Sequence, residues 1–185
     1  MSRESSEYHF VKVGKGRLAL NHRPGGRDFK LLRELGCTHV VTLLKESEFA
    51  QKIGNQTKNA GLEWVWVPVP NGNYPQGEVH ERLLNAMPHL SQLLDEGNSL
   101  FIHCSAGIHR TGTVAYGLLR WRGMERDEAM RVINEMRKET AEGMMEKRQR
   151  WGDENARQKI QQETSWVHSV KESLNRLITK LFKPR

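Results

Sequence analysis

Cys104 and Arg110 lie six positions apart in this 185-residue chain, and a thiol and a guanidinium at that spacing could act together on a phosphate group. They belong to the segment HCSAGIHRTG, residues 103–112, which follows an apolar run at 99–102 and precedes a helical pattern. A turn from a strand into a helix aims backbone N–H groups and the positive end of the helix at one point. We therefore expect this loop to bind an anion.

The thiol of Cys104 is well placed to act as a nucleophile in such a loop. Positions at helix N-termini lower a cysteine pKa from about 8.5 to roughly 3.5–7.5, so the reactive thiolate is present at neutral pH. Arg110 can hold two phosphate oxygens in a bidentate grip, and Gly107 lets the loop bend without a side chain filling it. The simpler alternative is a buried cysteine near an unrelated arginine. It does not explain why the preceding strand, the glycines and the following helix all fit an anion-binding loop.

This segment resembles the signature of the protein tyrosine phosphatase superfamily, His-Cys-x-x-Gly-x-x-Arg followed by Ser or Thr and then Gly. Every fixed position is filled here: His103, Cys104, Gly107, Arg110, Thr111 and Gly112. The short chain looks like the compact dual-specificity branch of that superfamily. The resemblance covers roughly residues 10–140.

The resemblance implies a mechanism and a set of roles. The family forms a phosphocysteine intermediate, here at Cys104, with a Thr111 hydroxyl that steadies the thiolate and a His103 that orients the loop. It uses neither a metal nor an organic cofactor. The phosphate would be bound by Arg110 and by the rest of the loop: Ser105, Ala106, Gly107, Ile108 and His109.

The chain departs from the family at the general acid. Relatives have an aspartate on an upstream loop, which should be residues 68–75 here, and its position falls on Asn71. An amide has no proton to give near neutral pH. General acid help is typically worth about 10²–10⁴-fold in rate, so the change matters.

Three explanations of Asn71 stay open. Another residue could donate the proton: His109 within the loop, or Glu78 or His80 just beyond residues 68–75. The substrate could instead be a phosphoanhydride, as for the RNA 5′-triphosphatases of the superfamily, whose leaving group needs no proton. The third is a slow phosphatase or a phosphate-binding module without turnover. We favour a phosphatase acting on phosphotyrosine or phosphoserine/threonine in proteins, with His109 mainly lining the pocket.

Strands and helices alternate along the chain. Apolar patterns predict strands at 10–13, 18–20, 40–44, 64–69 and 99–102, and helices at about 29–35, 46–53, 79–95, 111–122 and 127–137. Glu46 and Glu48 are interpreted as solvated helix residues. The alternation predicts a single α/β domain with a central, mainly parallel sheet flanked by helices, plus a C-terminal helical extension. We divide the chain into a flexible tail at 1–9, a dual-specificity-type phosphatase domain at 10–140 and a basic amphipathic extension at 141–185.

The extension concentrates the positive charge of the chain. The formal net charge is +7, and residues 147–185 contain ten basic and four acidic residues, a net of +6. That balance favours an anionic partner, and nucleic acid stays an open possibility. Apolar residues recur there at helical spacing and are expected to pack on the domain: Val167, Val170, Leu174, Leu177, Ile178 and Leu181.

Several classes of protein are excluded by composition. No run of 18 apolar residues exists and the N-terminus has no apolar stretch, so we expect neither a membrane-spanning helix nor a secretory signal, and a cytoplasmic protein. Cys37 and Cys104 are too few and too far apart for a disulfide scaffold, and Cys37 is interpreted as a core thiol. No Cys-x-x-Cys or His-x-x-x-His pair occurs, so no structural metal is expected.

Overall fold

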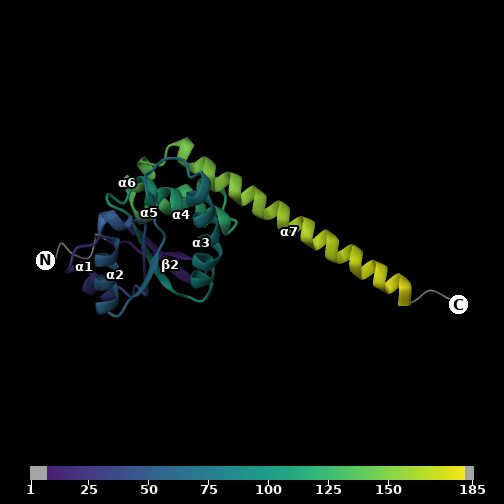
Figure 1. Ribbon diagram of the computed structural model, residues 1–185, viewed down its shortest axis with the longest axis horizontal. Coiled ribbons are helices and arrows are strands. Elements are labelled where there is room, and N and C mark those ends of the chain that lie inside the picture. The colour runs from purple at the N-terminus through teal and green to yellow at the C-terminus, as the bar shows by residue number, and fades with distance from the viewer. Residues whose placement is uncertain (1–7, 182–185) are drawn as a thin grey trace.

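A five-stranded sheet forms the centre of the protein, seen in a computed structural model that describes residues 8–181 apart from several side chains between 162 and 181 (Figure 1). Its strands are β1 (Val11–Val13), β2 (Gly16–Asn21), β3 (His39–Thr42), β4 (Glu63–Trp66) and β5 (Ser99–His103), in the spatial order β1-β2-β5-β3-β4. β1 pairs antiparallel with β2, and the other pairs are parallel. The predicted α/β fold with a mainly parallel sheet is confirmed.

Helices cover both faces of this sheet. α1 (Asp28–Glu34) and α2 (Ala50–Asn59) lie on one side, and α3 (Gly77–Asp95), α4 (His109–Trp121) and α5 (Arg126–Met136) lie on the other (Figure 1). A 3₁₀ turn, η1 (Glu46–Glu48), precedes α2, and a short helix, α6 (Lys138–Glu142), follows α5. The strand predicted at 64–69 ends earlier, at Trp66, although Val67 and Val69 still donate backbone hydrogen bonds to Thr42 and Leu43.

Strand side chains alternate between two apolar layers, as the period of two in a strand requires. Leu100 and Ile102 of β5 belong to the larger core with α3, α4 and α5, whereas Phe101 belongs to a smaller core with Leu32 of α1. The carboxyl end of β5, from which the chain continues to Cys104, is therefore packed on both faces of the sheet. The central strand β5 is buried along its whole length, which is typical of a strand within a parallel sheet.

The N-terminal segment joins the smaller core. Residues 1–7 of the expected tail lie outside the described residues, but Tyr8 is buried and meets the Phe101 ring edge-on at 5.4 Å. Cys37 is buried in the same core, and burial raises its pKa to about 12. Both cysteines are free thiols.

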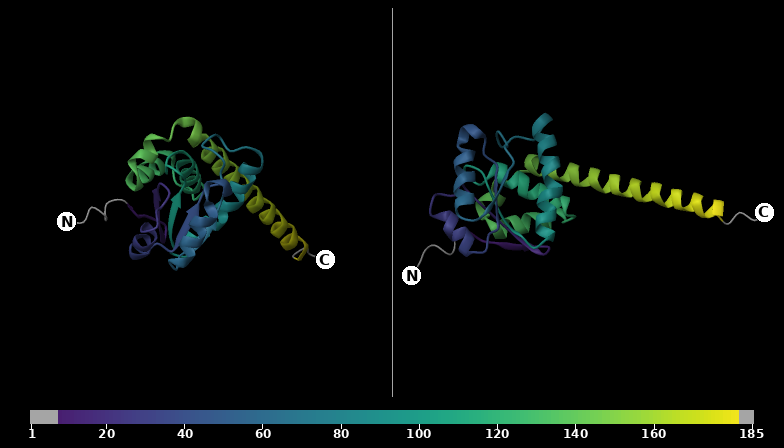
Figure 2. Two further views of the ribbon diagram at one scale, coloured as in Figure 1. Left: turned by 60° about the vertical axis from the view of Figure 1, so that its left-hand side comes forward. Right: turned by 60° about the horizontal axis from the view of Figure 1, so that its bottom comes forward.

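The last helix, α7 (Glu146–Leu181), begins on the domain and then leaves it (Figures 1 and 2). Trp151 is completely buried against Gly117 of α4, where a Cβ would lie 2.4 Å from the indole. Asp153 accepts hydrogen bonds from Tyr116 at 2.8 Å and Arg120 at 2.9 Å. The first turns of α7 thus pack on α4 and cover it. The predicted boundary between the phosphatase domain and the C-terminal extension, at residue 140, stays a prediction.

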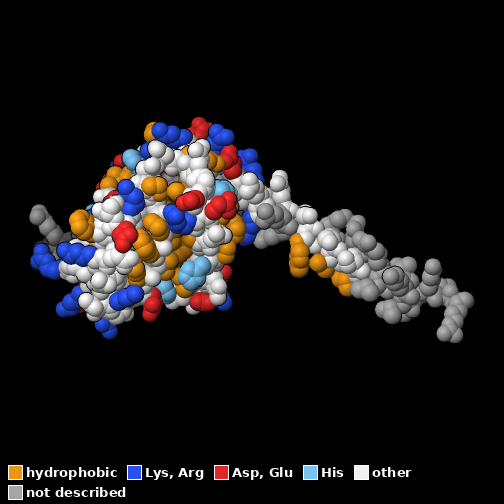
Figure 3. Space-filling view, viewed as in Figure 1, with side chains coloured by type: hydrophobic (Ala, Val, Ile, Leu, Met, Phe, Trp, Pro, Cys, Tyr) orange, Lys and Arg blue, Asp and Glu red, His pale blue; other side chains and the backbone are white. Residues whose placement is uncertain are grey.

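The rest of α7 corrects one expectation. Val167 and Leu174, expected to pack on the domain, are 56% and 53% exposed, and Val170 and Trp166 are exposed as well. Figure 3 shows apolar side chains along one side of the projecting helix, away from the domain. Helical periodicity reveals an apolar face but not what covers it, and α7 points away from the sheet before that face begins. The side chains of Leu177, Ile178 and Leu181 lie outside the described residues.

Candidate active site

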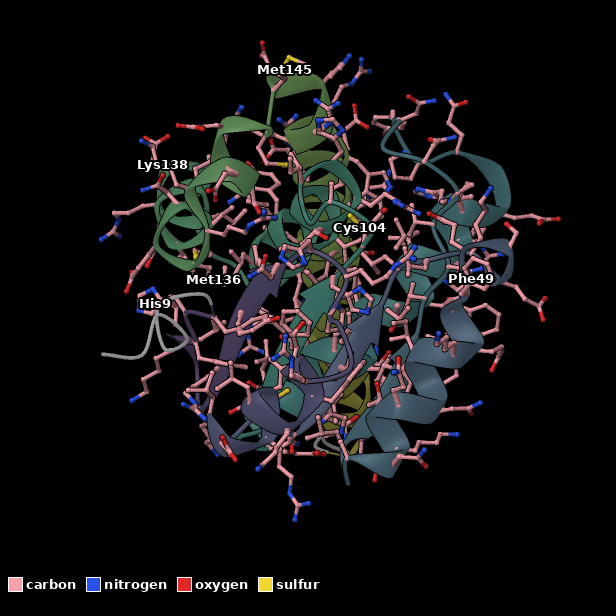
Figure 4. All side chains as sticks on the ribbon, turned by 90° about the vertical axis from the view of Figure 1, so that its left-hand side faces the viewer. His9, Phe49, Cys104, Met136, Lys138 and Met145 are labelled. Carbon is pink, nitrogen blue, oxygen red and sulfur yellow. The ribbon has the colours of Figure 1, made fainter. Side chains whose placement is uncertain are left out.

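The loop that follows β5 turns sharply into α4 at the carboxyl edge of the sheet, where Figure 4 places Cys104 near the centre of the molecule. Gly107 has a positive φ of 71°, and a Cβ there would lie 2.3 Å from the backbone of Asn21. Only glycine satisfies both conditions. The helix predicted to begin at Thr111 begins two residues earlier, at His109.

Carbonyl groups of the loop are held from outside by α5 and α6. Thr140 donates to the Gly107 carbonyl at 2.7 Å, and Arg137 donates to the Ala106 carbonyl at 2.9 Å. The Ser105 carbonyl accepts from the Arg23 backbone N–H at 3.1 Å. With their oxygens bound outward, these peptide groups present their N–H groups inward, which is the arrangement an anion needs.

The Cys104 thiol is buried at the base of this loop. Burial by itself would raise the pKa of Cys104. The Thr111 hydroxyl and backbone N–H act against burial, followed by the positive charge of Arg110 and the Gly107 N–H, which lies 3.2 Å from the sulfur. The pKa of Cys104 ends below the ordinary thiol value. A larger fraction of nucleophilic thiolate is therefore present at neutral pH.

His103 is a neutral imidazole beneath the loop. It is completely buried, and this burial lowers its pKa to about 3. Its Nδ1 lies 3.2 Å from the Cys104 carbonyl oxygen, and its Nε2 lies 2.9 Å from the Thr42 hydroxyl. It does not touch the cleft; it holds the backbone of Cys104 from below.

Arg110 is paired with Glu48, which the sequence pattern led us to expect as a solvated helix residue. Both Nη atoms lie 2.8 Å from the carboxylate oxygens of Glu48, and Nη1 also donates to the Val69 carbonyl at 3.1 Å. The Arg110 hydrogen bond lowers the pKa of Glu48 to about 2. Glu48 is thus an ion-pair partner and not a solvated helix residue. No local signal marks it, because the two residues are 62 positions apart.

This pairing leaves one edge of the guanidinium for a ligand. Glu48 takes the end-on edge of Arg110, formed by both Nη atoms, and Val69 takes the second Nη1 proton. The side-on edge, Nε–H with the remaining Nη2–H, has no oxygen partner among the described residues. A guanidinium has five N–H donors in a fixed fork, so it can bind a carboxylate and a phosphate together.

A cleft of about 240 Å³ lies above Cys104 and Arg110. The loop at residues 70–72 forms its other wall, so Asn71 and His109 face the same space. Its lining residues include every predicted phosphate-loop residue except Gly107, which is buried below: Pro70, Asn71, Gly72, Cys104, Ser105, Ala106, Ile108, His109 and Arg110.

The three candidates for a surrogate acid differ in position. His109 lines the cleft and packs against Gly72, where a Cβ would lie 2.5 Å from the His109 Cβ. His80 lies outside the lining, with its Nδ1 accepting the Trp151 indole N–H at 3.0 Å. Glu78 is exposed at the start of α3 and is also absent from the lining. His109 is the one candidate that the structure brings to Cys104.

The surroundings of His109 favour its neutral imidazole. Partial burial lowers its pKa below the usual range, and the positive charges of Arg148 and Lys147 act in the same direction. A bound phosphate dianion would oppose this effect by favouring the imidazolium. Among residues 8–181, no group of three or more His, Cys, Asp or Glu side chains is placed to hold a metal ion.

This geometry is that of a cysteine-based phosphatase, and the comparisons give the family. A family model described as "PTP-SAK: Swiss Army Knife protein, DSP-PTPase phosphatase domain" matches residues 8–165. The chain therefore belongs to the protein tyrosine phosphatase superfamily, in its compact dual-specificity branch. The family predicted from the signature at residues 103–112 is thus confirmed.

Individual relatives are similar at moderate to low identity. Laforin of Mus musculus is 28% identical over 107 residues, which cover 50% of this chain and 32% of laforin, about a third of that relative's length. The solved structure of Tk-PTP in its active form has a TM-score of 0.63 at 22% identity, covering 83% of this chain and 97% of that one. PTPMT1 has a TM-score of 0.66 at 17% identity, covering 85% and 99%. These structures establish the fold.

Proposed function

We propose that this protein hydrolyses phosphomonoesters, such as phosphotyrosine or phosphoserine/threonine in proteins, through a phosphocysteine at Cys104. The single observation behind the proposal is the Cys104 sulfur, whose pKa is lowered while it faces the Gly107 N–H and the charge of Arg110. A thiolate, a ring of inward N–H groups and an arginine fork together suit a phosphate dianion.

The reaction takes two steps. In the first, the Cys104 thiolate attacks phosphorus, the S–P bond forms as the P–O bond of the leaving group breaks, and the departing oxygen takes a proton. In the second, water attacks the phosphocysteine, releasing inorganic phosphate and the thiolate. Arg110 and the loop N–H groups stabilise the charge on the equatorial oxygens in both steps.

The sequence assigns Asn71 to the position of the family's aspartate, so on this proposal the first step lacks the usual acid. His109 as the imidazolium is the nearest candidate donor, since it lines the same cleft. Where no residue donates, good leaving groups are favoured. That observation supports a second candidate function, the hydrolysis of phosphoanhydrides, whose leaving group departs as an anion. A slow phosphatase or phosphate-binding protein is the third interpretation: the Cys104–Arg110 pair favours turnover, and Asn71 favours binding without it.

The decisive experiment combines kinetics with trapping. Purified protein is mixed with a small aryl phosphate, quenched in acid within milliseconds and digested for mass spectrometry. We expect a phosphorylated peptide containing Cys104, together with a burst of phenol in stopped flow. Cys104→Ser should retain phosphate binding and show neither signal. Turnover by Cys104→Ser near the native rate would rule out the mechanism.

The location and further partners are also proposals. None of the helices in residues 8–181 combines the length and apolar character needed to cross a membrane. We assign the protein to the cytoplasm because a reducing compartment keeps a low-pKa thiol such as Cys104 active. The basic C-terminal extension is assigned an anionic partner, supported by the net charge of +6 in residues 147–185.

A further inference from the structure

A chain of three hydrogen bonds runs from strand β4 to the loop that holds Cys104. The Trp64 indole Nε1 lies 2.9 Å from the Thr42 hydroxyl oxygen, and that oxygen lies 2.9 Å from Nε2 of His103. Nδ1 of His103 lies 3.2 Å from the Cys104 carbonyl oxygen. The three side chains come from β4, β3 and β5, which are neighbours in the sheet.

The direction of each hydrogen bond follows from the chemistry of the groups. An indole N–H can only donate, so the Thr42 oxygen accepts from Trp64. The single hydroxyl proton of Thr42 is then available for Nε2 of His103, which must be unprotonated to accept it. The Cys104 carbonyl oxygen can only accept, so Nδ1 of His103 carries a proton and donates it there. Because burial keeps His103 neutral, this is its one ring proton, and Nε2 is left to accept from Thr42.

We propose that Trp64 is a positioning residue that orients the Thr42 hydroxyl toward Nε2 of His103, favours the tautomer with the proton on Nδ1, and thereby holds the Cys104–Ser105 peptide in place. The importance of this role for catalysis rests on the proposed function. Trp64 lies two strands away from the loop and does not line the cleft. It occupies one of the two lone pairs of the Thr42 oxygen, and this favours the arrangement in which the hydroxyl proton points to Nε2 over the one in which the oxygen accepts from a protonated Nε2.

That alternative would weaken the loop at its base. With the proton on Nε2, the lone pair of Nδ1 would face the Cys104 carbonyl oxygen and their hydrogen bond would be lost. The same peptide unit supplies the Ser105 N–H at the bottom of the cleft. A hydrogen bond accepted by a peptide carbonyl strengthens the N–H of that peptide as a donor. Loss of the Nδ1 bond should therefore weaken anion binding and raise the pKa of Cys104.

Trp66 provides a matched control within the same strand. Its ring is stacked on Trp64, with centroids 5.6 Å apart and planes 13° apart, and it is half-buried like Trp64. Its Nε1 also donates, but to the Leu44 carbonyl at 2.8 Å, which has no link to His103. Replacement of either tryptophan by phenylalanine removes one indole N–H from the same stack, and only one of the two changes reaches His103.

The test compares Trp64→Phe, Trp66→Phe and native protein in three measurements. Nitrogen-15 NMR of the histidine rings reports the tautomer of His103. The pH dependence of iodoacetamide alkylation reports the pKa of Cys104, and steady-state kinetics report kcat. For Trp64→Phe we expect a population with the proton on Nε2, a raised pKa of Cys104 and a kcat lower by about three- to tenfold, the size of one net hydrogen bond. Trp66→Phe should match native protein in all three.

A second pair of variants keeps the test decisive if Trp64→Phe folds poorly. Thr42→Val removes the hydroxyl with little change of shape and should raise the pKa of Cys104, whereas Thr42→Ser keeps the hydroxyl and should restore it. An unchanged His103 tautomer and Cys104 pKa in Trp64→Phe or Thr42→Val would overturn the inference. A shifted tautomer in a protein that never forms phosphocysteine would instead refute the proposed function alone.

Discussion

Glu48 holds Arg110 end-on, with both Nη atoms 2.8 Å from the two carboxylate oxygens. The side chains are 23% and 11% exposed, so the pair is largely shielded from solvent at the edge of the cleft. Arg110 also interacts with Cys104, and the two charges stabilise one another. An arginine that is already oriented loses less side-chain entropy when it binds phosphate.

We predict that Glu48→Gln weakens phosphate binding, because the amide keeps one contact but loses the charge that aligns the fork. The value of kcat/KM for an aryl phosphate should fall by about tenfold, within the range for losing one charge-assisted hydrogen bond. Glu46→Gln is the control, since Glu46 belongs to the same 3₁₀ turn but is exposed. An equal effect of both changes would show that the turn matters and the ion pair does not.

The same pair should appear in the acid stability of the protein. The pKa of Glu48 is lowered from 4.5 to about 2 in the folded state, so its pairing stabilises the fold above the unfolded pKa. That contribution is lost as pH falls from about 4.5 through about 2. Urea unfolding across this window should therefore show a steeper loss of stability in native protein than in Glu48→Gln. Parallel curves would mean that Arg110 does not lower the Glu48 pKa.

Thr111 should control the ionisation of Cys104. Its hydroxyl is the largest of the influences that lower the pKa of Cys104 against burial. Thr111→Val is therefore expected to raise that pKa, which moves the acid limb of the kcat/KM profile to higher pH. Thr111→Ser keeps the hydroxyl and should return the limb to its native position. The measurement is alkylation rate against pH, and an unmoved limb in Thr111→Val would contradict the assignment.

The start of α7 should contribute to stability in a way that its exposed part does not. Trp151 is completely buried against α4, whereas Trp166 on the same helix is 68% exposed. We expect Trp151→Ala to lower the free energy of unfolding by about 3–5 kcal/mol, as for other buried aromatic residues. Trp166→Ala should change it by less than about 0.5 kcal/mol. Equal effects in urea denaturation would show that the first turns of α7 do not pack on the domain.

What the sequence could reveal depended on how far apart the interacting residues are. The loop at 103–112 and its flanking strand and helix are local, and their pattern predicted both the fold and the place of Cys104. The partnership of Glu48 with Arg110 and the path from Trp64 to His103 depend on strands that meet only after folding. The spacing of residues along the sequence does not indicate contacts between segments that are 61 or 62 positions apart.

The C-terminal helix is a second case in which the sequence predicted an element but not its contacts. Its period predicted a helix with an apolar face, and α7 is helical through Leu181. Whether that face packs on its own domain is decided by the direction in which α7 leaves α4, which is set by Trp151 and Asp153. Neither residue stands out in the sequence, because one tryptophan and one aspartate in a polar helix have many ordinary explanations.

The last prediction concerns Asn71, which the sequence assigns to the position of the family's general acid. Asn71 lines the cleft opposite Cys104, so Asn71→Asp should place a carboxyl group where it can protonate the departing oxygen. Proton donation helps in proportion to the basicity of the leaving group. We therefore expect Asn71→Asp to accelerate alkyl and phenyl phosphates, by up to about 10²-fold, and to change p-nitrophenyl phosphate little. A plot of log kcat against leaving-group pKa should become flatter.

His109→Ala in the native background tests whether the imidazole already performs this task. If it does, the variant should slow poor leaving groups more than good ones, and the native rate on poor leaving groups should fall as pH rises through the lowered pKa of His109. If His109 only lines the cleft, all leaving groups should change alike and that pH limb should be absent. Identical slopes for native protein and Asn71→Asp would have one of two meanings, which His109→Ala separates. If His109→Ala steepens the slope, the imidazole already donates the proton; if it does not, residues 68–75 do not close over the phosphate.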